Sequence, residues 1–319
     1  MKQKSVFRAT ESYIVEQSLK IRTFAEAKEI IGGDHAVGFS DVTKMPCKTY
    51  SLPATMCRMG TKLRSVEGSV CSDCYACPSE NASKHNSGWY GRDRVQQPMN
   101  HRLLQVWFNP RWADAMIFLF QHYKFKIFRW HDSGDIQNKK HFEDICRIAD
   151  AAPMTKFWLP TQEWGAGSII ENYWVEHGMI PLKELHPNLI IRLSARMKNG
   201  EAPVWYAKRL GVTTSRVSTK NEDVSCIAAK QGNNCGACRK CWDQEEMEII
   251  YHYHGGNNHF MQSTFMKRVQ KSIIFMTEQG VDKTTMYKQV SEKFHISNIA
   301  VRVATAKLKK KMNNLKVLE

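Results

Sequence analysis

Helical and strand-like hydrophobic patterns alternate through the middle of the chain, between about residues 100 and 210. LLQVWF, WADAMIFLFQHY and HFEDICRIADAA carry apolar residues at helical spacing, whereas KIFRW, KFWLP and LIIRLSA are short apolar runs typical of buried strands. Such β-α-β alternation predicts a parallel sheet covered by helices. We therefore expect an α/β protein whose sheet is open, or forms a barrel-like or partial barrel structure of the TIM type.

Three segments differ in pattern, and they suggest three domains. Residues 1–45 form a helical lead-in, with FAEAKEII as its best helix, ending at Gly32-Gly33. Residues 46–259 hold the α/β pattern together with two cysteine-rich loops, the first of which, to about residue 91, has little apolar periodicity. Because such a loop cannot bury much apolar surface, we expect a metal to stabilise it. Residues 260–319 are helical and basic.

Charge points to a polyanionic partner. The chain holds 46 Lys+Arg against 31 Asp+Glu, a net charge of +15, which favours nucleic acid, DNA or RNA, over a basic surface with no such role. Residues 260–319 alone hold 12 Lys+Arg and 4 Asp+Glu, or +8. Here Thr284 and Ser297 can cap two successive helices, the length pattern of a helix-turn-helix or of a solvated helical hairpin. Its second helix would present to nucleic acid Arg302, Lys307, Lys309, Lys310 and Lys311.

The chain has no run of about 18 apolar residues, and its first twenty are too polar for a signal peptide. We therefore expect no membrane partner and a cytoplasmic protein, while the oligomeric state stays open. In a reducing compartment the ten cysteines are expected to be thiols, and clustered thiols are expected to bind metal. Cys146, on the apolar face of its helix, is expected to be a core residue.

The most closely spaced thiols lie in CIAAKQGNNCGACRKCW. Two residues separate neighbouring cysteines in CGACRKC, so the chain can curl around one ion or cluster, and Gly232 and Gly236 permit the turns. This spacing favours an iron–sulfur cluster over a zinc ion. The third hypothesis is that the four thiols bind no metal. The predicted ligands are Cys226, Cys235, Cys238 and Cys241.

An earlier set of thiols lies in MPCKTYSLPATMC and VCSDCYAC. Cys71 and Cys74 form a CxxC pair, and Cys57 is the predicted third ligand, with Cys47 and Cys77 as the alternatives. Three ligands would leave one position of a [4Fe–4S] cluster open for substrate or for S-adenosylmethionine, whereas four would make the site structural. The sequence leaves both readings open.

Polar residues follow three successive predicted strands. Ligands of α/β proteins bind at the carboxyl ends of strands, so HDSGDIQ after KIFRW predicts a site with catalytic His131, Asp132 and Asp135. Asp135 or Ser133 could instead cap the helix that begins near Asn138. The residues predicted to bind substrate at this edge are Ser133, Thr161, Gln162 and Arg196. Three nearby tryptophans could pack in the core or stack on a base: Trp130, Trp158 and Trp164.

Five segments together resemble a family known as gene product eighty-eight, from about Lys44 to about His254. They are SLPATMC, VCSDCYA, FRWHDSGDIQ, KFWLPTQEW and NCGACRKCWD. The resemblance implies a phage or prophage origin, and thus the host cytoplasm, but no reaction.

Two shorter likenesses suggest chemistry. CYA after a close cysteine pair resembles the end of the cluster loop of radical S-adenosylmethionine proteins. DSGDIQ resembles the DSGGFQ segment of deazaguanine transglycosylases. This likeness implies that Asp132 contacts a base and that Gln137 binds the polar edge of that base. It also implies that the later cysteine set, from Cys226 to Cys241, holds zinc.

The leading hypothesis from the sequence is an iron–sulfur, radical-type enzyme that modifies nucleic acid or a nucleotide. In it the first cysteine set is catalytic, the second is auxiliary and the HDSGD turn binds substrate. The alternatives are a zinc-dependent base-exchange enzyme and a non-catalytic nucleic-acid-binding or regulatory metalloprotein.

Overall fold

Seven strands form one sheet in which spatial order follows sequence order. The computed structural model describes residues 20–32, 38–42, 44–72, 74, 76–77, 93–220, 223–232, 234–253, 264–294, 298, 301–302, 304–306 and 308. Only β1 is antiparallel to its neighbour, and every later strand is parallel to the one before it. The strands are β1 (Ser40–Asp41), β2 (Lys48–Tyr50), β3 (Ile127–Trp130), β4 (Lys156–Thr161), β5 (Leu189–Ser194), β6 (Thr213–Ser218) and β7 (Glu248–His252).

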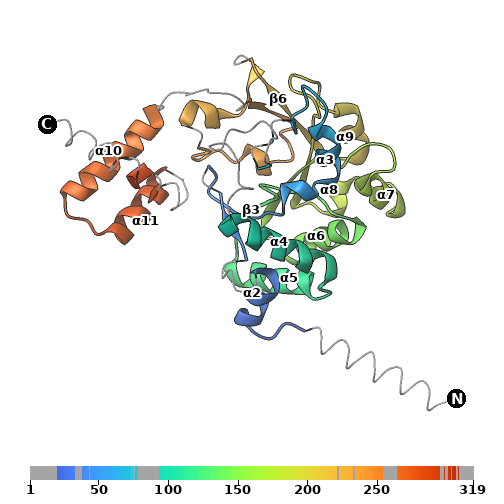
Figure 1. Ribbon diagram of the computed structural model, residues 1–319, viewed down its shortest axis with the longest axis horizontal. Helices are drawn as coiled ribbons and strands as arrows, with labels where there is room; N and C mark the ends of the chain where they lie inside the picture. Colours follow the sequence, from blue (N-terminus) through green and yellow to red (C-terminus); the bar gives the residue numbers. More distant parts are fainter. Residues whose placement is uncertain are drawn as a thin grey trace, which may run out of the picture.

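Helices cover one face of this sheet. Right-handed crossovers that always step to the next strand in the same direction leave their helices on the same side. Figure 1 shows α6–α9 along that side. The main hydrophobic core lies between the helices and the sheet, and it includes the strand residues Phe128, Phe157 and Leu159. The helices of this part are α2 (Phe24–Gly32), α3 (Arg58–Arg64), α4 (Asp93–Phe108), α5 (Trp112–Tyr123), α6 (Lys139–Ala151), α7 (Ile169–Glu176), α8 (Leu182–Leu185) and α9 (Val204–Leu210).

The opposite face is covered by the second cysteine-rich segment. Strand side chains alternate between faces, so Trp158 points away from Phe157 and Leu159 and packs in a smaller core with Trp242 and Ile249. Short 3₁₀ turns η4 (Ile227–Gln231) and η5 (Lys240–Trp242) shape this segment, and another, η2 (Ala54–Met56), precedes α3. The segment therefore fills the face that a singly wound sheet leaves bare.

Arg192, in the middle of β5, fixes the segment to the sheet. Its side chain is fully buried and donates to the backbone oxygens of Thr214 at 3.2 Å, Glu246 at 2.7 Å, and Lys240 and Asp243 at 2.9 Å each. A guanidinium has five N–H donors in a planar fork, so one side chain can satisfy several carbonyls of an irregular loop.

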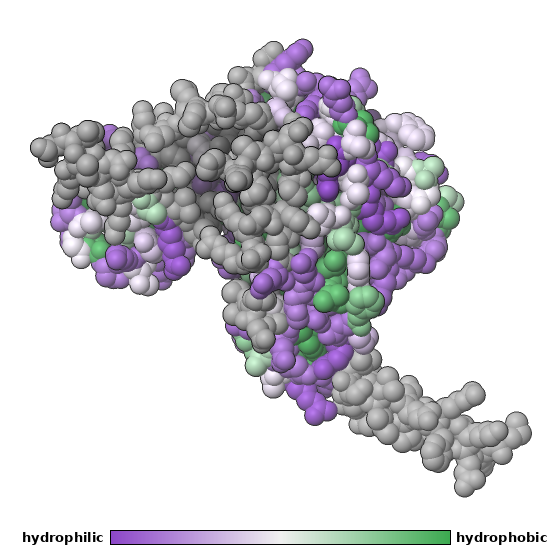
Figure 2. Space-filling model, viewed as in Figure 1, coloured by the Kyte–Doolittle hydropathy of each residue, from purple (hydrophilic) through white to green (hydrophobic). Residues whose placement is uncertain are grey.

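The C-terminal helices form a second hydrophobic core. Helices α10 (Thr264–Glu278) and α11 (Lys283–Phe294) pack with Val301 and Ala304 of the chain that follows. Figure 1 shows them as a lobe beside the sheet. Hydrophilic side chains cover most of the described surface in the view of Figure 2, with apolar residues in small patches.

The structure confirms the α/β class, the parallel sheet, the strands at KIFRW, KFWLP and LIIRLSA, the FAEAKEII helix and the buried Cys146. The sheet is not closed, because the order runs from β1 to β7 without a ladder between its ends. Thr284 does not cap α11: Asp282 Oδ1 accepts from the backbone N–H groups of Thr284 and Thr285, at 2.9 and 3.1 Å, and Ser297 lies outside the described residues. No helix among the described residues is long and apolar enough to cross a membrane.

Candidate functional site

The turn after β3 is pressed against the end of β2. His131 has φ of 51° and Gly134 has φ of 90°, and the backbone N–H of Leu52 donates to the Ser133 oxygen at 2.8 Å. A Cβ on Gly134 would lie 2.6 Å from the Leu52 Cβ. Glycine is therefore required both by the backbone angle and by the contact.

Asp135 is buried and links the ends of β3 and β4. Its Oδ1 accepts from the Thr161 hydroxyl at 2.7 Å and from the Ile136 N–H at 2.8 Å, and its Oδ2 accepts from the Gln162 N–H at 2.9 Å. Burial raises the pKa of Asp135 to about 6, although these hydrogen bonds act in the opposite sense. A carboxyl group with such a pKa can take up or release a proton near neutral pH.

Asp132 faces a different environment, although it lies only three residues away. Its carboxylate pairs with the Arg129 guanidinium at 2.6 Å, and that guanidinium lies over the Trp158 ring, 4.7 Å from the centroid. Asp132 therefore belongs to the face that the second cysteine segment covers, whereas Asp135 points to the strand ends.

His131 and His141 form a buried pair of rings with centroids 5.3 Å apart. His141 Nδ1 accepts the Gln137 N–H at 3.2 Å, so its proton is on Nε2. That Nε2 and both ring nitrogens of His131 have no hydrogen-bond partner among the described residues. Burial, with Arg129 as a second cause, lowers the pKa of His131 to about 3. The imidazoles are therefore neutral.

The helix after the turn is capped by neither Ser133 nor Asp135, so the alternative hypothesis that one of them is a helix cap is wrong. Asn138 is the N-cap of α6, and its Oδ1 accepts from the His141 N–H at 2.8 Å. Gln137 donates from Nε2 to the backbone oxygen of Asp135 at 2.6 Å, so its amide stabilises the turn itself.

Polar residues after β4 and β5 gather beside Asp135. Gln162 Nε2 donates to the Ala195 oxygen at 3.2 Å, and buried Glu163 pairs with Arg58 of α3 at 3.8 Å. The Arg196 guanidinium stacks on Trp164, 4.0 Å from the ring centroid. The strand ends thus bring together four of the predicted residues: Asp135, Thr161, Gln162 and Arg196.

The first cysteine set lies at the same edge. Its segment is held to the loop after β5, because the Val70 N–H donates to the Arg196 oxygen at 2.9 Å. The sulfurs of Cys57 and Cys71 each lie 3.7 Å from the position that a Cβ on Gly60 would take. Both sulfurs therefore lie next to Gly60, where a Cβ would be in ordinary van der Waals contact with them but only 2.8 Å from the Cys57 Cβ.

Cys74 and Cys77 complete this group. A hydrogen bond with the Cys77 thiol and the backbone N–H groups of Ala76 and Cys77 lower the pKa of Cys74 to about 6, and burial opposes them. The Arg64 guanidinium donates to Cys77 Sγ at 2.8 Å. Since the thiolate is the form that binds metal, Cys74 is the thiol best prepared for ligation.

Cys47 belongs to the second set rather than to the first. It packs with Cys241 and Cys226 in the smaller core, at the start of β2. The four predicted ligands of this set line one cavity of about 20 Å³, and backbone N–H groups of Cys235 and Cys238 donate to the oxygens of Lys44 and Cys235, at 2.9 and 3.0 Å. The Cys241 sulfur lies 3.3 Å from the Tyr251 hydroxyl.

The donor chemistry of both sets fits a thiolate-bound metal. All ten cysteines are free thiols. In the described part of the chain, however, no three His, Cys, Asp or Glu side chains are placed close enough together to hold an ion, so ligation by either set stays a prediction.

The predicted nucleic-acid helix falls mainly outside the described residues, which omit Lys307, Lys309, Lys310 and Lys311. Arg302 is described, and its guanidinium lies 5.6 Å from the centroid of the Tyr287 ring.

Several features of this region are not predicted by the local sequence pattern. They are the strands β6 and β7, the burial of Arg192 and the position of Cys47. One signal was available, since an arginine inside the apolar run LIIRL needs buried acceptors.

These observations define a class: an α/β protein with an open, mostly parallel sheet, whose aspartate-bearing turn lies between two groups of thiols. The chain belongs to the family described as Gene product 88, which matches residues 20–244 and so includes both cysteine sets. The comparisons matched no curated protein and no solved structure. They likewise give no support to the radical S-adenosylmethionine and transglycosylase likenesses.

Proposed function

We propose that the protein is an iron–sulfur enzyme of the radical type that modifies nucleic acid or a nucleotide. Cys57, Cys71 and Cys74 would hold the cluster, and the HDSGD turn with the ends of β4 and β5 would hold the substrate. The observation that carries the proposal is the convergence of Cys57 and Cys71 beside Gly60, at the edge of the sheet where Asp135 meets Thr161 and Gln162.

The fold supports this placement. Six parallel strands follow one another in spatial order, and ligands of parallel α/β sheets bind at the carboxyl ends of strands. A [4Fe–4S] cluster with three thiolate ligands supplies an open iron position for S-adenosylmethionine and an electron for its cleavage.

The protein's own groups would position substrate and move protons. Asp135 is the candidate acid or base, because its pKa of about 6 allows both protonation states near neutral pH. Arg196 and Gln162 are candidate substrate donors, while His131 is neutral and its ring nitrogens have no hydrogen-bond partner in the described part of the chain.

The second cysteine set is proposed to be structural. Its cavity of about 20 Å³ is close to the size of a single small occupant, which favours one zinc ion over an auxiliary cluster. The same cavity size supports the second candidate function, a zinc-dependent base-exchange enzyme.

Metal content after anaerobic purification tests the proposal. The wild-type chain should contain about four iron atoms for the first site, and Cys71→Ser should lose them while Cys146→Ser, in the core, keeps them. Gly60→Ala should also lose iron, because its Cβ would lie 2.8 Å from the Cys57 Cβ, although alanine favours a helix.

Two results would overturn it. One is a colourless protein with stoichiometric zinc and no iron. The other is full iron content in Cys71→Ser, which would place the iron elsewhere. Cys238→Ser is the matched variant for the second set and should lose zinc alone.

A further inference from the structure

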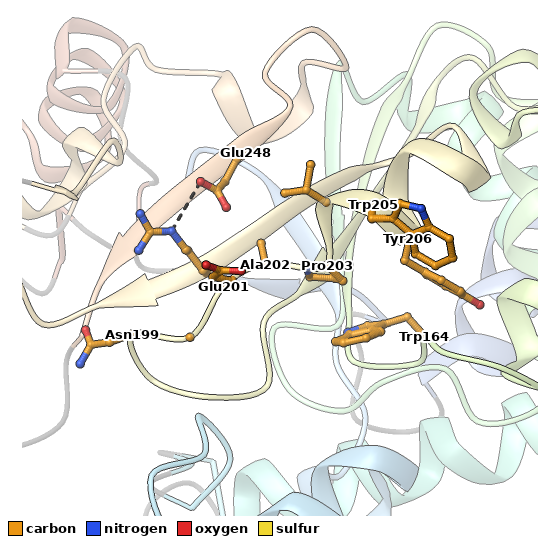
Figure 3. A pocket seen from close by; sticks show the side chains of 11 residues that line it. Trp164, Asn199, Glu201, Ala202, Pro203, Trp205, Tyr206 and Glu248 are labelled. Atoms are coloured by element: carbon orange, nitrogen blue, oxygen red, sulfur yellow. Dashed lines mark hydrogen bonds and ion pairs between the residues drawn. The ribbon is translucent and has the colours of Figure 1, made fainter.

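A cavity of about 750 Å³ lies next to the strand ends and is not used by the proposed cluster site. It is bounded by Trp164 after β4, the loop 199–203, the first turn of α9, and Arg216 and Glu248 of the last two strands (Figure 3). Pockets of this volume typically accommodate small organic ligands.

Three aromatic side chains form one end of the cavity. Trp164 is fixed, since its Nε1 donates to the Ser194 oxygen at 2.8 Å and Arg196 covers a face of its ring. Tyr206 is fixed by its hydroxyl, which donates to the Gly165 oxygen at 2.8 Å. Trp205 is 74% exposed, so its indole has a large apolar surface available to cover with a ligand.

Charged groups form the other end. Arg216 Nε and Glu248 Oε2 lie 3.5 Å apart, and neither side chain has another charged partner within the described residues. Glu201 adds a second carboxylate to the lining. Two carboxylates against one guanidinium disfavour a phosphate here but suit a planar group with N–H donors, because carboxylates accept from base amines and arginine donates to base acceptors.

The cavity shares a wall with the candidate active site. The Asn199 N–H donates to the Val217 oxygen and the Lys198 N–H to the Gly68 oxygen, each at 2.9 Å, so this loop contacts both β6 and the first cysteine segment. Trp164 directly follows Glu163, which pairs with α3. A group bound in the cavity therefore lies beside the edge that carries Asp135 and the first cysteine segment.

We propose that this cavity binds a single unpaired nucleobase, stacked against Trp205 and Trp164 with its polar edge toward Arg216 and Glu248. The inference rests on the proposed function for its choice of substrate, and it names the part of the substrate that this chain would recognise. Aromatic stacking platforms with a few polar side chains are how proteins commonly hold splayed-out bases.

Titration of the full-length protein with adenosine, guanosine, cytidine and uridine tests the proposal, with binding followed by calorimetry. At least one nucleoside should bind, and Trp205→Ala should weaken it roughly tenfold or more, as expected for loss of one stacking partner. Glu248→Gln should change the ranking of the four nucleosides. Phe108→Ala is the matched control, since Phe108 is 73% exposed on α4 and does not line the cavity.

Equal affinity of the wild type and Trp205→Ala for every nucleoside would overturn the inference, as would binding of an arginine-containing peptide with no nucleoside bound. Two measurements separate this proposal from the iron–sulfur proposal. If Cys71→Ser binds nucleosides as the wild type does, the cavity binds a base without the cluster ligand. If the wild type in addition holds no iron, the iron–sulfur proposal fails while the cavity assignment stands.

Discussion

Gly134 sets the geometry of the aspartate turn, because its φ of 90° and its approach to Leu52 bring Asp135 to the ends of β3 and β4. Gly134→Ala should lower the free energy of unfolding by about 2–4 kcal/mol, from backbone strain and steric overlap combined. Gly167→Ala is the control, since φ is 70° there but a Cβ meets open space; it should cost about 1 kcal/mol. Urea denaturation measures both, and equal losses would contradict the close packing at Gly134.

The buried imidazole of His131 predicts acid sensitivity. Its pKa is lowered to about 3 in the folded protein, by burial first and Arg129 second, from 6.5 in an unfolded chain. The stability it permits is complete above pH 6.5 and is lost as pH falls toward 3, because only the unfolded chain binds the proton in that window.

His131→Asn should therefore flatten the dependence of unfolding free energy on pH by up to about 1.4 kcal/mol per unit between pH 6 and 4. Asparagine also tolerates the positive φ at this position. Asp135, whose pKa is raised, acts in the opposite sense in both proteins and cancels in the difference. Exposed His122→Asn is the control, and parallel curves for His131→Asn and wild type would show that His131 is accessible to protons.

At the scale of elements, β5 and the second cysteine segment depend on each other through Arg192. Arg192→Met should destabilise the protein by about 3–5 kcal/mol, because it leaves several buried carbonyls of the segment without donors. Arg209→Met, on the exposed surface of α9, should cost under about 1 kcal/mol. Thermal unfolding compares the two, and similar midpoints would mean that solvent satisfies those carbonyls.

The elements also show why prediction from sequence succeeded in one region and failed in another. The helices α5 and α6 and the strands β3–β5 have one strong apolar periodicity each, since they pack against the main core. β6 reads TTSRVS, and its apolar pattern is weak because most of its buried residues are small and polar. Its strand conformation is fixed by pairing with β5 and β7, which local sequence does not encode.

At the scale of the whole molecule, positive charge and chemistry lie in different parts of the chain. The sheet contains the candidate site, whereas +8 of the net +15 lies in residues 260–319. If this charge holds the proposed nucleic-acid partner, removal of these residues should abolish most salt-dependent binding to DNA or RNA while the main core, which α10 and α11 do not join, stays folded.

Binding at several salt concentrations, with circular dichroism as the control for folding, measures this effect. An unchanged affinity and salt slope would mean that the C-terminal charge is only a surface property. A loss of the folded state would instead show that the C-terminal lobe stabilises the sheet.

The sequence by itself determined the α/β class, most of the central helices and strands, and the residue types of the site. Apolar periodicity and cysteine spacing are local features, so they can be recognised in the sequence before the fold is known. Only the tertiary structure decided which thiols meet: Cys57 lies with Cys71, whereas Cys47 lies with Cys241. It also separated Asp132 from Asp135 and formed the cavity beside Trp164. These depend on which strand ends become neighbours, and that is set by long-range packing of the sheet rather than by any short stretch of chain.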